Sequence, residues 1–281
     1  MTAPRVLVVS AITVVLALAS ASAARADRPA GSVTKSAGNV TATLSWGAGE
    51  FAVSNPRLAI SRAGALVTDV SVADACRSCV LVEDSPDGSF SILNVADLDA
   101  DGEPEVFFDV FSGGAHCCTT TRFYTWRSTL GTYRRAPSTY WGNAGYEVVD
   151  LDGDGRLELS GRDDAFAYAF ASYAGSAFPP KILRYEGNPA TGVSTLTDVT
   201  RRFPTVLRAD AARLRSIIRK AKPRKRFYEY QGALAAYVAD EYLLGKGSVG
   251  RAEVRRARRR GLTAPGFMGE LLKFLRKTGY R

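Results

Sequence analysis

The sequence predicts a mainly β protein, an incomplete propeller-like or sandwich β domain that is followed by a small α-helical module at the C-terminal end. Three observations support this fold class. Short β-rich segments alternate with Gly, Asp, Asn and Pro turns from Asn39 to about Asp198, an aspartate-rich motif occurs twice, and helical periodicity begins at Pro204. Two copies of a repeat are too few to close a propeller, so we expect an open arrangement of sheets.

Residues 1–26 have the pattern of a secretory signal peptide. Arg5 gives a positive n-region, residues 6–19 are apolar, and Ala24-Arg25-Ala26 offers a small-x-small cleavage site. The apolar run is shorter than the roughly 20 residues that a membrane-spanning helix needs. No cysteine lies near the cleavage point, so we expect no lipoprotein anchor. The sequence thus predicts a secreted or extracytoplasmic protein, while retention of this segment as an uncleaved anchor stays open.

Charge divides the remaining chain into two parts. Residues 27–198 carry 13 Lys and Arg against 22 Asp and Glu, whereas residues 199–281 carry 22 against 6. Charge and periodicity change at nearly the same place, so we expect a β-rich domain over residues 27–204 and a basic helical module over residues 205–281.

The individual elements follow from hydrophobic spacing. Large and small residues alternate in three segments, which predicts core strands at residues 41–46, 122–126 and 166–170. In the tail, apolar residues recur at helical spacing; they are Leu207, Ala211, Leu214 and Ile218, and then Leu234, Tyr237, Val238 and Tyr242. We expect four short helices, with Gly245 and Gly261 as helix stops.

The repeated motif has the residue types and the spacing of a calcium loop. Calcium takes roughly six to eight oxygen ligands, and alternate Asp residues in a tight turn direct their carboxylates to one point. The first loop provides, at positions one, three, five, seven and nine, Asp97, Asp99, Asp101, the carbonyl of Glu103, and Glu105. The second provides Asp150, Asp152, Asp154, the carbonyl of Arg156, and Glu158. Gly102 and Gly155 permit the sharp turn in each loop.

Both loops lack the acid at position twelve that an EF-hand uses, and both continue into β-type sequence. We therefore expect strand-to-strand loops with calcium as the cofactor. The alternative is that they are ordinary solvated Asp-Gly turns. Against it, several carboxylates gathered in so short a loop repel one another until a cation joins them.

The two loops and their flanking strands resemble the FG-GAP/VCBS-type repeats of bacterial, and in particular actinobacterial, extracytoplasmic proteins. The segments at residues 112–118 and 163–170 look like parts of secreted proteins with such repeats. The resemblance implies calcium between strands, and it implies no activity and no catalytic residue.

Four cysteines occur in two clusters, Cys76 with Cys79 and Cys117 with Cys118. An even number in an exported chain favours disulfides, and we expect pairing between the clusters because a bridge between adjacent cysteines closes a strained ring. A zinc site that uses these thiolates and His116 stays an alternative, as does a nucleophilic Cys117 with His116 as its base.

The tail has a dense arginine pattern on one helical face. Four of its arginines form a candidate anion-binding surface: Arg251, Arg255, Arg256 and Arg259. Anionic cell-envelope polymers or lipid headgroups suit such a surface, and a solvated basic surface without a partner is the alternative. We find no signature of specific nucleic-acid reading and no transmembrane partner.

Taken together, these patterns predict a secreted calcium-binding structural or binding module of the cell surface or extracellular space. The chain lacks the common hydrolase motifs and has one histidine, so an enzyme is not the first expectation. An extracytoplasmic hydrolase that acts on a cell-surface polymer stays the alternative.

Overall fold

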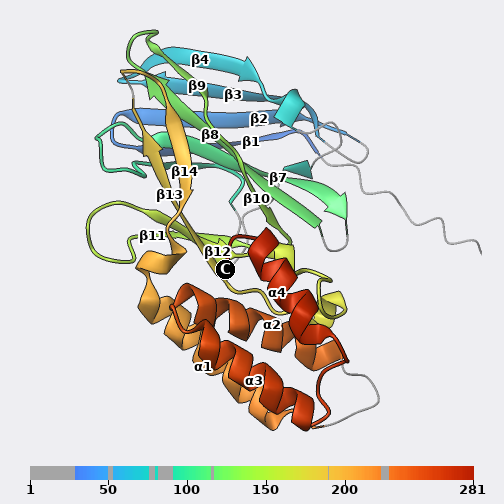
Figure 1. Cartoon of the computed structure of the whole chain (residues 1–281). Helices are drawn as coiled ribbons and strands as arrows, with labels where there is room; N and C mark the ends of the chain where they lie inside the picture. Colours follow the sequence, from blue (N-terminus) through green and yellow to red (C-terminus); the bar gives the residue numbers. More distant parts are fainter. Residues whose placement is uncertain are drawn as a thin grey trace, which may run out of the picture.

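The computed structural model describes residues 29–49, 53–75, 80–81, 91–114, 117–188, 190–222 and 228–281. Within these residues, three antiparallel sheets lead along the chain to four α-helices (Figure 1). The mainly β character and the helical C-terminal part are as the sequence predicts. The sheets of the described chain do not close into a propeller.

The first sheet is a four-stranded meander in the order β1-β2-β3-β4. Its strands are β1 (Gly31–Ala37), β2 (Val40–Gly47), β3 (Ser54–Arg62) and β4 (Ala65–Ser71). Val40, Ala42 and Leu44 of β2 are fully buried while the residues between them are half-buried, because successive side chains of a strand point to opposite faces.

The second sheet has six strands, with β10-β8-β7-β5 as its main path, β6 paired to β7 and β9 paired to β8. They are β5 (Val80–Leu81), β6 (Asn94–Ala96), β7 (Glu105–Gly114), β8 (Cys117–Arg127), β9 (Thr132–Arg135) and β10 (Thr139–Gly142). This sheet is a middle layer. Val106 and Phe108 of β7 pack in a cluster with β2 and β3, whereas Phe107 between them packs in a cluster with the third sheet.

The third sheet has the order β11-β12-β13-β14. Its strands are β11 (Tyr146–Val149), β12 (Glu158–Arg162), β13 (Pro180–Gly187) and β14 (Ser194–Asp198). Residues 166–170, which the sequence predicts as a strand, are not one. Phe166 ends a short 3₁₀ turn (Asp164–Phe166) that Asp163 caps, and its ring is buried among the helices. Alternating aromatic and alanine residues thus mark a turn that buries Phe166 and leaves Tyr168 exposed.

The helices are α1 (Pro204–Lys220), α2 (Tyr228–Leu243), α3 (Gly247–Arg259) and α4 (Phe267–Lys277). Helix α1 begins where the periodicity changes, and Gly245 and Gly261 adopt positive φ angles just after α2 and α3 end, as expected of helix stops. Helix α2 packs centrally, with residues 234–239 almost completely buried. None of the described helices combines the length and the apolar composition needed to cross a bilayer.

Candidate cation site in the repeated acidic loops

The two acidic loops belong to a repeated structural unit of a strand, the loop and two further strands. In the first unit β6, β7 and β8 pair in order, and in the second β11, β12 and β13 do the same. The register is also the same, because Ala96 pairs with Glu105 and Val149 pairs with Glu158. The sequence repeat therefore corresponds to a repeat in three dimensions.

The loops close through equivalent hydrogen bonds. The first Asp of each loop accepts from the glycine amide, with 2.9 Å between Gly102 N and Asp97 Oδ2 and 2.9 Å between Gly155 N and Asp150 Oδ2. The glutamate at position nine accepts from the leucine amide at position two, at 3.2 Å in the first loop and 3.0 Å in the second. Each loop is thus held as a tight, pre-formed turn that presents its remaining carboxylate oxygens.

Position four of the two loops has a different residue but the same left-handed backbone conformation. Ala100 in the first loop has φ 60° and Gly153 in the second has φ 75°. A left-handed conformation costs an L-residue about 1–2 kcal/mol, whereas glycine adopts it freely. The first loop keeps this strained alanine, so its shape is imposed by the hydrogen bonds around it.

The first loop gathers negative charge without a basic partner. Oxygens of Asp97, Asp99 and Asp101 lie within 4.8 Å of one another, and Oδ1 of Asp99 is buried without a hydrogen-bond partner in the described structure. Glu105, only 1% exposed, accepts hydrogen bonds from Leu98 N and from the Thr125 hydroxyl at 3.2 Å. In the described part of the chain, no Lys or Arg forms an ion pair with any of these four acids.

Electrostatics follow from this arrangement. Burial, together with repulsion from Asp99, raises the pKa of Glu105 to about 9. Burial also raises the pKa of Asp101, with added repulsion from Asp99 and Asp97. Two oxygens bound to one calcium ion at roughly 2.4 Å each lie at most about 5 Å apart, so the three aspartates are spaced as calcium ligands require. The donor set of the first loop fits a hard divalent cation.

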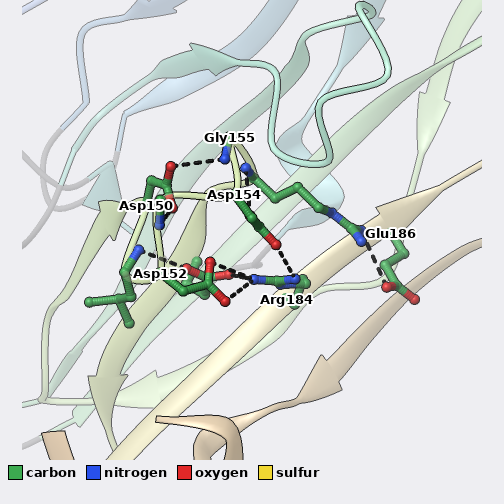
Figure 2. Close-up of polar contacts among 10 residues, drawn as sticks. Asp150, Asp152, Asp154, Gly155, Arg184 and Glu186 are labelled. Carbon is green, nitrogen blue, oxygen red and sulfur yellow. Dashed lines mark hydrogen bonds and ion pairs between the residues drawn. The ribbon is translucent and has the colours of Figure 1, made fainter. Parts of the chain in front are cut away.

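The second loop already contains a cation, the guanidinium of Arg184 from β13 (Figure 2). Its Nε lies 2.7 Å from Glu158 Oε1, its Nη1 lies 3.0 Å from Asp154 Oδ2, and its Nη2 lies 3.4 Å from Asp152 Oδ2. Arg184 is 2% exposed and Glu158 is fully buried. The backbone amide of Arg156 and the guanidinium lower the pKa of Asp154, the opposite of the shift at Asp101 in the first loop.

The side chains at position seven of both loops turn to partners outside the loop. The carboxylate of Glu103 forms an ion pair with Arg62, with 3.1 Å between Arg62 Nε and Oε2, and Arg156 lies 3.2 Å from Glu186. Their side chains are thus engaged outside the loops, and the role of the main-chain carbonyls of Glu103 and Arg156 as ligands stays a prediction.

Two residues that contact the loop glutamates lie outside the loop motif and were not predicted from the sequence. Thr125 lies on β8 and Arg184 on β13, the second strand after each loop. They are opposite Glu105 and Glu158 respectively, and each donates to Oε1 of its glutamate. A charged residue inside the buried run Ile182-Leu183-Arg184-Tyr185 is the one feature of the sequence from which Arg184 could have been found.

The cysteine predictions fall largely outside the described side chains. Those of Cys76, Cys79 and Cys117 are not described, nor is His116. Cys118 is not a free thiol, and its Sγ accepts a hydrogen bond from the Tyr140 hydroxyl at 3.0 Å. The connectivity, and with it the zinc and nucleophile alternatives, stays a prediction.

The predicted anion-binding arginines of α3 divide into two kinds. Arg251 donates to the Tyr242 hydroxyl at 2.7 Å, and Arg256 pairs with Glu253 at 2.8 Å. Arg255 and Arg259 are exposed, as is Arg258 beside them. Arg256 is exposed as well, but its guanidinium is already paired, so Arg255, Arg258 and Arg259 are the ones available to a partner.

A cavity of about 570 Å³ lies where the third sheet meets the helices. It is lined by Arg162, Arg213, Phe178 and small residues of the segment before β13, with no acidic side chain among its lining residues. It therefore does not supply the pair of carboxylates that a glycosidase needs.

No family model matches the chain, and no solved structure matches it. The chain is 29% identical over 157 residues to a probable thylakoid lumen protein of Synechocystis sp. The aligned region covers 56% of this chain and 44% of the relative. The chain is also 37% identical over 91 residues to an uncharacterized protein of Sinorhizobium fredii. This second aligned region covers 31% of this chain and 13% of that protein. The chain thus spans less than half the length of either relative.

Proposed function

We propose that the protein is an extracytoplasmic calcium-binding module in which calcium in the first acidic loop stabilises the stacked sheets. One observation carries the proposal: the carboxylates of Asp97, Asp99 and Asp101 converge, and in the described chain neither they nor the buried Glu105 beside them pair with a basic side chain. Buried charges are costly unless they are paired or coordinate a metal. A divalent cation is the partner that this donor set lacks.

An extracytoplasmic location is supported by two independent features. The N-terminal 26 residues have the pattern of a signal peptide. The Synechocystis relative, matched over 44% of its length, is described as a probable thylakoid lumen protein. Extracellular calcium modules work with dissociation constants of roughly 10⁻⁴ to 10⁻³ M, which suits the calcium level outside a cell.

The proposed kinship with FG-GAP/VCBS-type repeats is supported by the repeated strand and loop units of the structure. Two units of strand, acidic loop, strand and strand share their register and their closing hydrogen bonds. The position of the first loop between the middle sheet and the third sheet gives calcium a structural role, because Leu98 of this loop is completely buried in the cluster that joins these sheets.

A second part of the proposal concerns the partner. The exposed arginines of α3, on a tail with a large excess of Lys and Arg, suit an anionic envelope polymer or anionic lipid headgroups. The calcium module then acts as the rigid part that presents this helix.

The calcium proposal is tested by thermal unfolding of the full mature chain in 1 mM calcium and in chelator. With a dissociation constant near 0.1 mM, calcium contributes about 1.4 kcal/mol, which raises the Tm by roughly 3–6 °C. Magnesium should restore the Tm poorly, because it keeps its waters and prefers a stricter octahedral geometry.

The variant Asp99→Asn with Asp101→Asn should unfold at the same temperature in calcium and in chelator. Asp69→Asn is a matched control, because this exposed acid lies on β4 and pairs with Arg57 instead of facing the loop. Identical melting curves of the wild type with and without calcium would refute the proposal.

A further inference from the structure

We infer that the guanidinium of Arg184 takes, in the second acidic loop, the place that calcium takes in the first, so that the protein binds one calcium ion and supplies the second cation from its own chain. The inference rests on the proposed calcium site of the first loop. It changes the expectation for the second loop, where the motif predicts another calcium ion and where oxygens of Asp150, Asp152 and Glu158 also lie within 4.8 Å of one another.

The register of the two units supports the equivalence. Glu158 pairs with Arg184 across β12 and β13. In the first unit, Val106 pairs with Tyr124 across β7 and β8, which sets Glu105 opposite Thr125. Thr125 and Arg184 thus occupy the same position of the repeat, and both donate to Oε1 of the glutamate at position nine.

The two side chains differ in what they bring to that position. A threonine hydroxyl provides one hydrogen bond and no charge, whereas an arginine guanidinium provides five donors and a permanent positive charge. In the second loop this charge contacts Asp152, Asp154 and Glu158 together (Figure 2). In the first loop the equivalent acids are Asp99, Asp101 and Glu105, and Oδ1 of Asp99 remains buried without a partner in the described structure.

Repulsion excludes calcium from the second loop while Arg184 stays in place. A divalent ion among these carboxylates would stand close to a buried guanidinium of like sign, with little water between them to screen the repulsion. Calcium would also compete for oxygens that already accept from the guanidinium. Moving Arg184 out is costly in turn, because this side chain is only 2% exposed and would leave Glu158 buried and unpaired.

The consequence is a division of roles between the two repeats. The second unit has its acidic loop neutralised at any calcium level, whereas the carboxylates of the first are neutralised only when calcium is bound. Calcium binding is therefore assigned to the first unit alone, whereas the second unit is neutralised by its own arginine.

Calcium stoichiometry, measured by isothermal titration calorimetry on the full mature chain, tests the inference. The wild type should bind one calcium ion, Asp99→Asn with Asp101→Asn should bind none, and Asp152→Asn with Asp154→Asn should bind one with an affinity within about threefold of the wild type. Two ions in the wild type, or loss of binding in the Asp152/Asp154 variant, would overturn the inference but keep the proposed function. No binding by the wild type would overturn both.

Replacement of the internal cation gives a gain-of-binding test. Arg184→Thr copies the residue found in the first unit and should raise the stoichiometry to two, whereas Arg184→Lys keeps the positive charge and should leave it at one. A folded Arg184→Thr protein that binds one ion contradicts the inference. The two double variants decide the question independently, because neither alters Arg184.

Discussion

Tyr280 donates a hydrogen bond through its hydroxyl to Oδ2 of Asp163 at 2.8 Å, across 117 residues of sequence. The ring of Tyr280 also packs edge-on against Phe166, with 5.4 Å between the ring centroids. Figure 1 shows the C-terminus beside β12. The end of the chain is thus attached to the segment that connects β12 and β13, and residues of this segment share a core with the helices.

The first prediction concerns this attachment. Burial raises the pKa of Tyr280, so its hydroxyl stays protonated and remains a donor to Asp163. Hydrogen bonds to charged groups contribute about 1.5–3 kcal/mol, so Tyr280→Phe should lower the free energy of unfolding by about 1.5 kcal/mol. A double-mutant cycle with Asp163→Asn, measured by urea unfolding, should give a coupling energy of about 1 kcal/mol. Strictly additive effects of the two substitutions would show that the contact contributes nothing.

The second prediction concerns Arg260, which lies just after α3. Its guanidinium donates to the carbonyl oxygens of Ile218, Arg219 and Ala221, at 3.2, 3.3 and 2.7 Å, and so completes the C-terminal end of α1. The carbonyl of Ile218 also accepts from the amide of Ala221 at 3.3 Å, but the last carbonyls of a helix generally lack enough partners within it. Arg260→Ala should therefore lower the free energy of unfolding by about 1–2 kcal/mol.

Its neighbour Arg259 is a matched control, because it is an exposed arginine one residue earlier. Arg259→Ala should change the unfolding free energy by less than about 0.5 kcal/mol. Equal effects of the two substitutions, in guanidinium chloride unfolding followed by circular dichroism, would refute the capping role of Arg260.

The third prediction is a pH dependence that arises from Asp109 of β7. This side chain is completely buried and accepts hydrogen bonds from the Thr121 hydroxyl at 2.6 Å, the Tyr146 hydroxyl at 3.1 Å and Ser91 N at 3.2 Å. Burial nevertheless raises the pKa of Asp109 from 3.8 to about 6, because it disfavours the charged form more than these bonds favour it.

A raised carboxyl pKa means that the folded state holds the proton more tightly than the unfolded state. The stabilisation is complete below about pH 4 and is lost as the pH rises through about 6, by at most about 3 kcal/mol. Urea unfolding at pH 4 to 7 in saturating calcium should show this decline relative to Asp109→Asn. The asparagine variant should be less stable throughout, since its amide nitrogen cannot accept from Ser91 N, but it should lack this titration. Parallel pH profiles of the two proteins would contradict the assignment.

The fourth prediction concerns the exposed arginines of α3. Replacement of Arg255, Arg258 and Arg259 by Gln should weaken binding to vesicles with anionic headgroups by about tenfold at low salt. Each basic residue near such a surface contributes about 1 kcal/mol of binding free energy, and screening by salt removes part of this contribution. Sedimentation of vesicles with the bound protein measures this.

The control changes the same number of charges on α4. Lys273, Arg276 and Lys277 are also exposed, so their replacement by Gln removes equal net charge from another face. If both triple variants lose binding equally, the interaction follows net charge and α3 is not a binding surface.

Much of this fold is readable from the sequence because its signals are local. Helix α1 begins at Pro204 and carries apolar residues at helical spacing, and the acidic loops are defined by residues within one short turn. The strand predicted at residues 166–170 was wrong because period-two alternation of aromatic and small residues also suits a turn. Here Phe166 and Phe170 pack in a core formed by helices distant in sequence, and Tyr168 between them is exposed.

The residue that contacts the buried glutamate of each loop could not be predicted, because this contact also joins segments distant in sequence. Which residue lies opposite Glu105 or Glu158 depends on the register of two strands, and that register is set by the packing of both faces of a sheet. Thr125 and Arg184 lie 20 and 26 residues beyond these glutamates, so no local motif contains them. The motif predicts where carboxylates gather, whereas tertiary structure decides what neutralises them.

Leu98 joins the two acidic loops through its own backbone. Its amide donates to Glu105 within the first loop, and its carbonyl accepts from the amide of Leu157 in the second loop at 2.9 Å. One residue therefore belongs to the closing hydrogen bonds of both units, and it is completely buried. Local opening of one loop removes a bond from the other, so the pair exchanges its amide hydrogens as a single cooperative unit, whose protection rises with the calcium concentration around the protein.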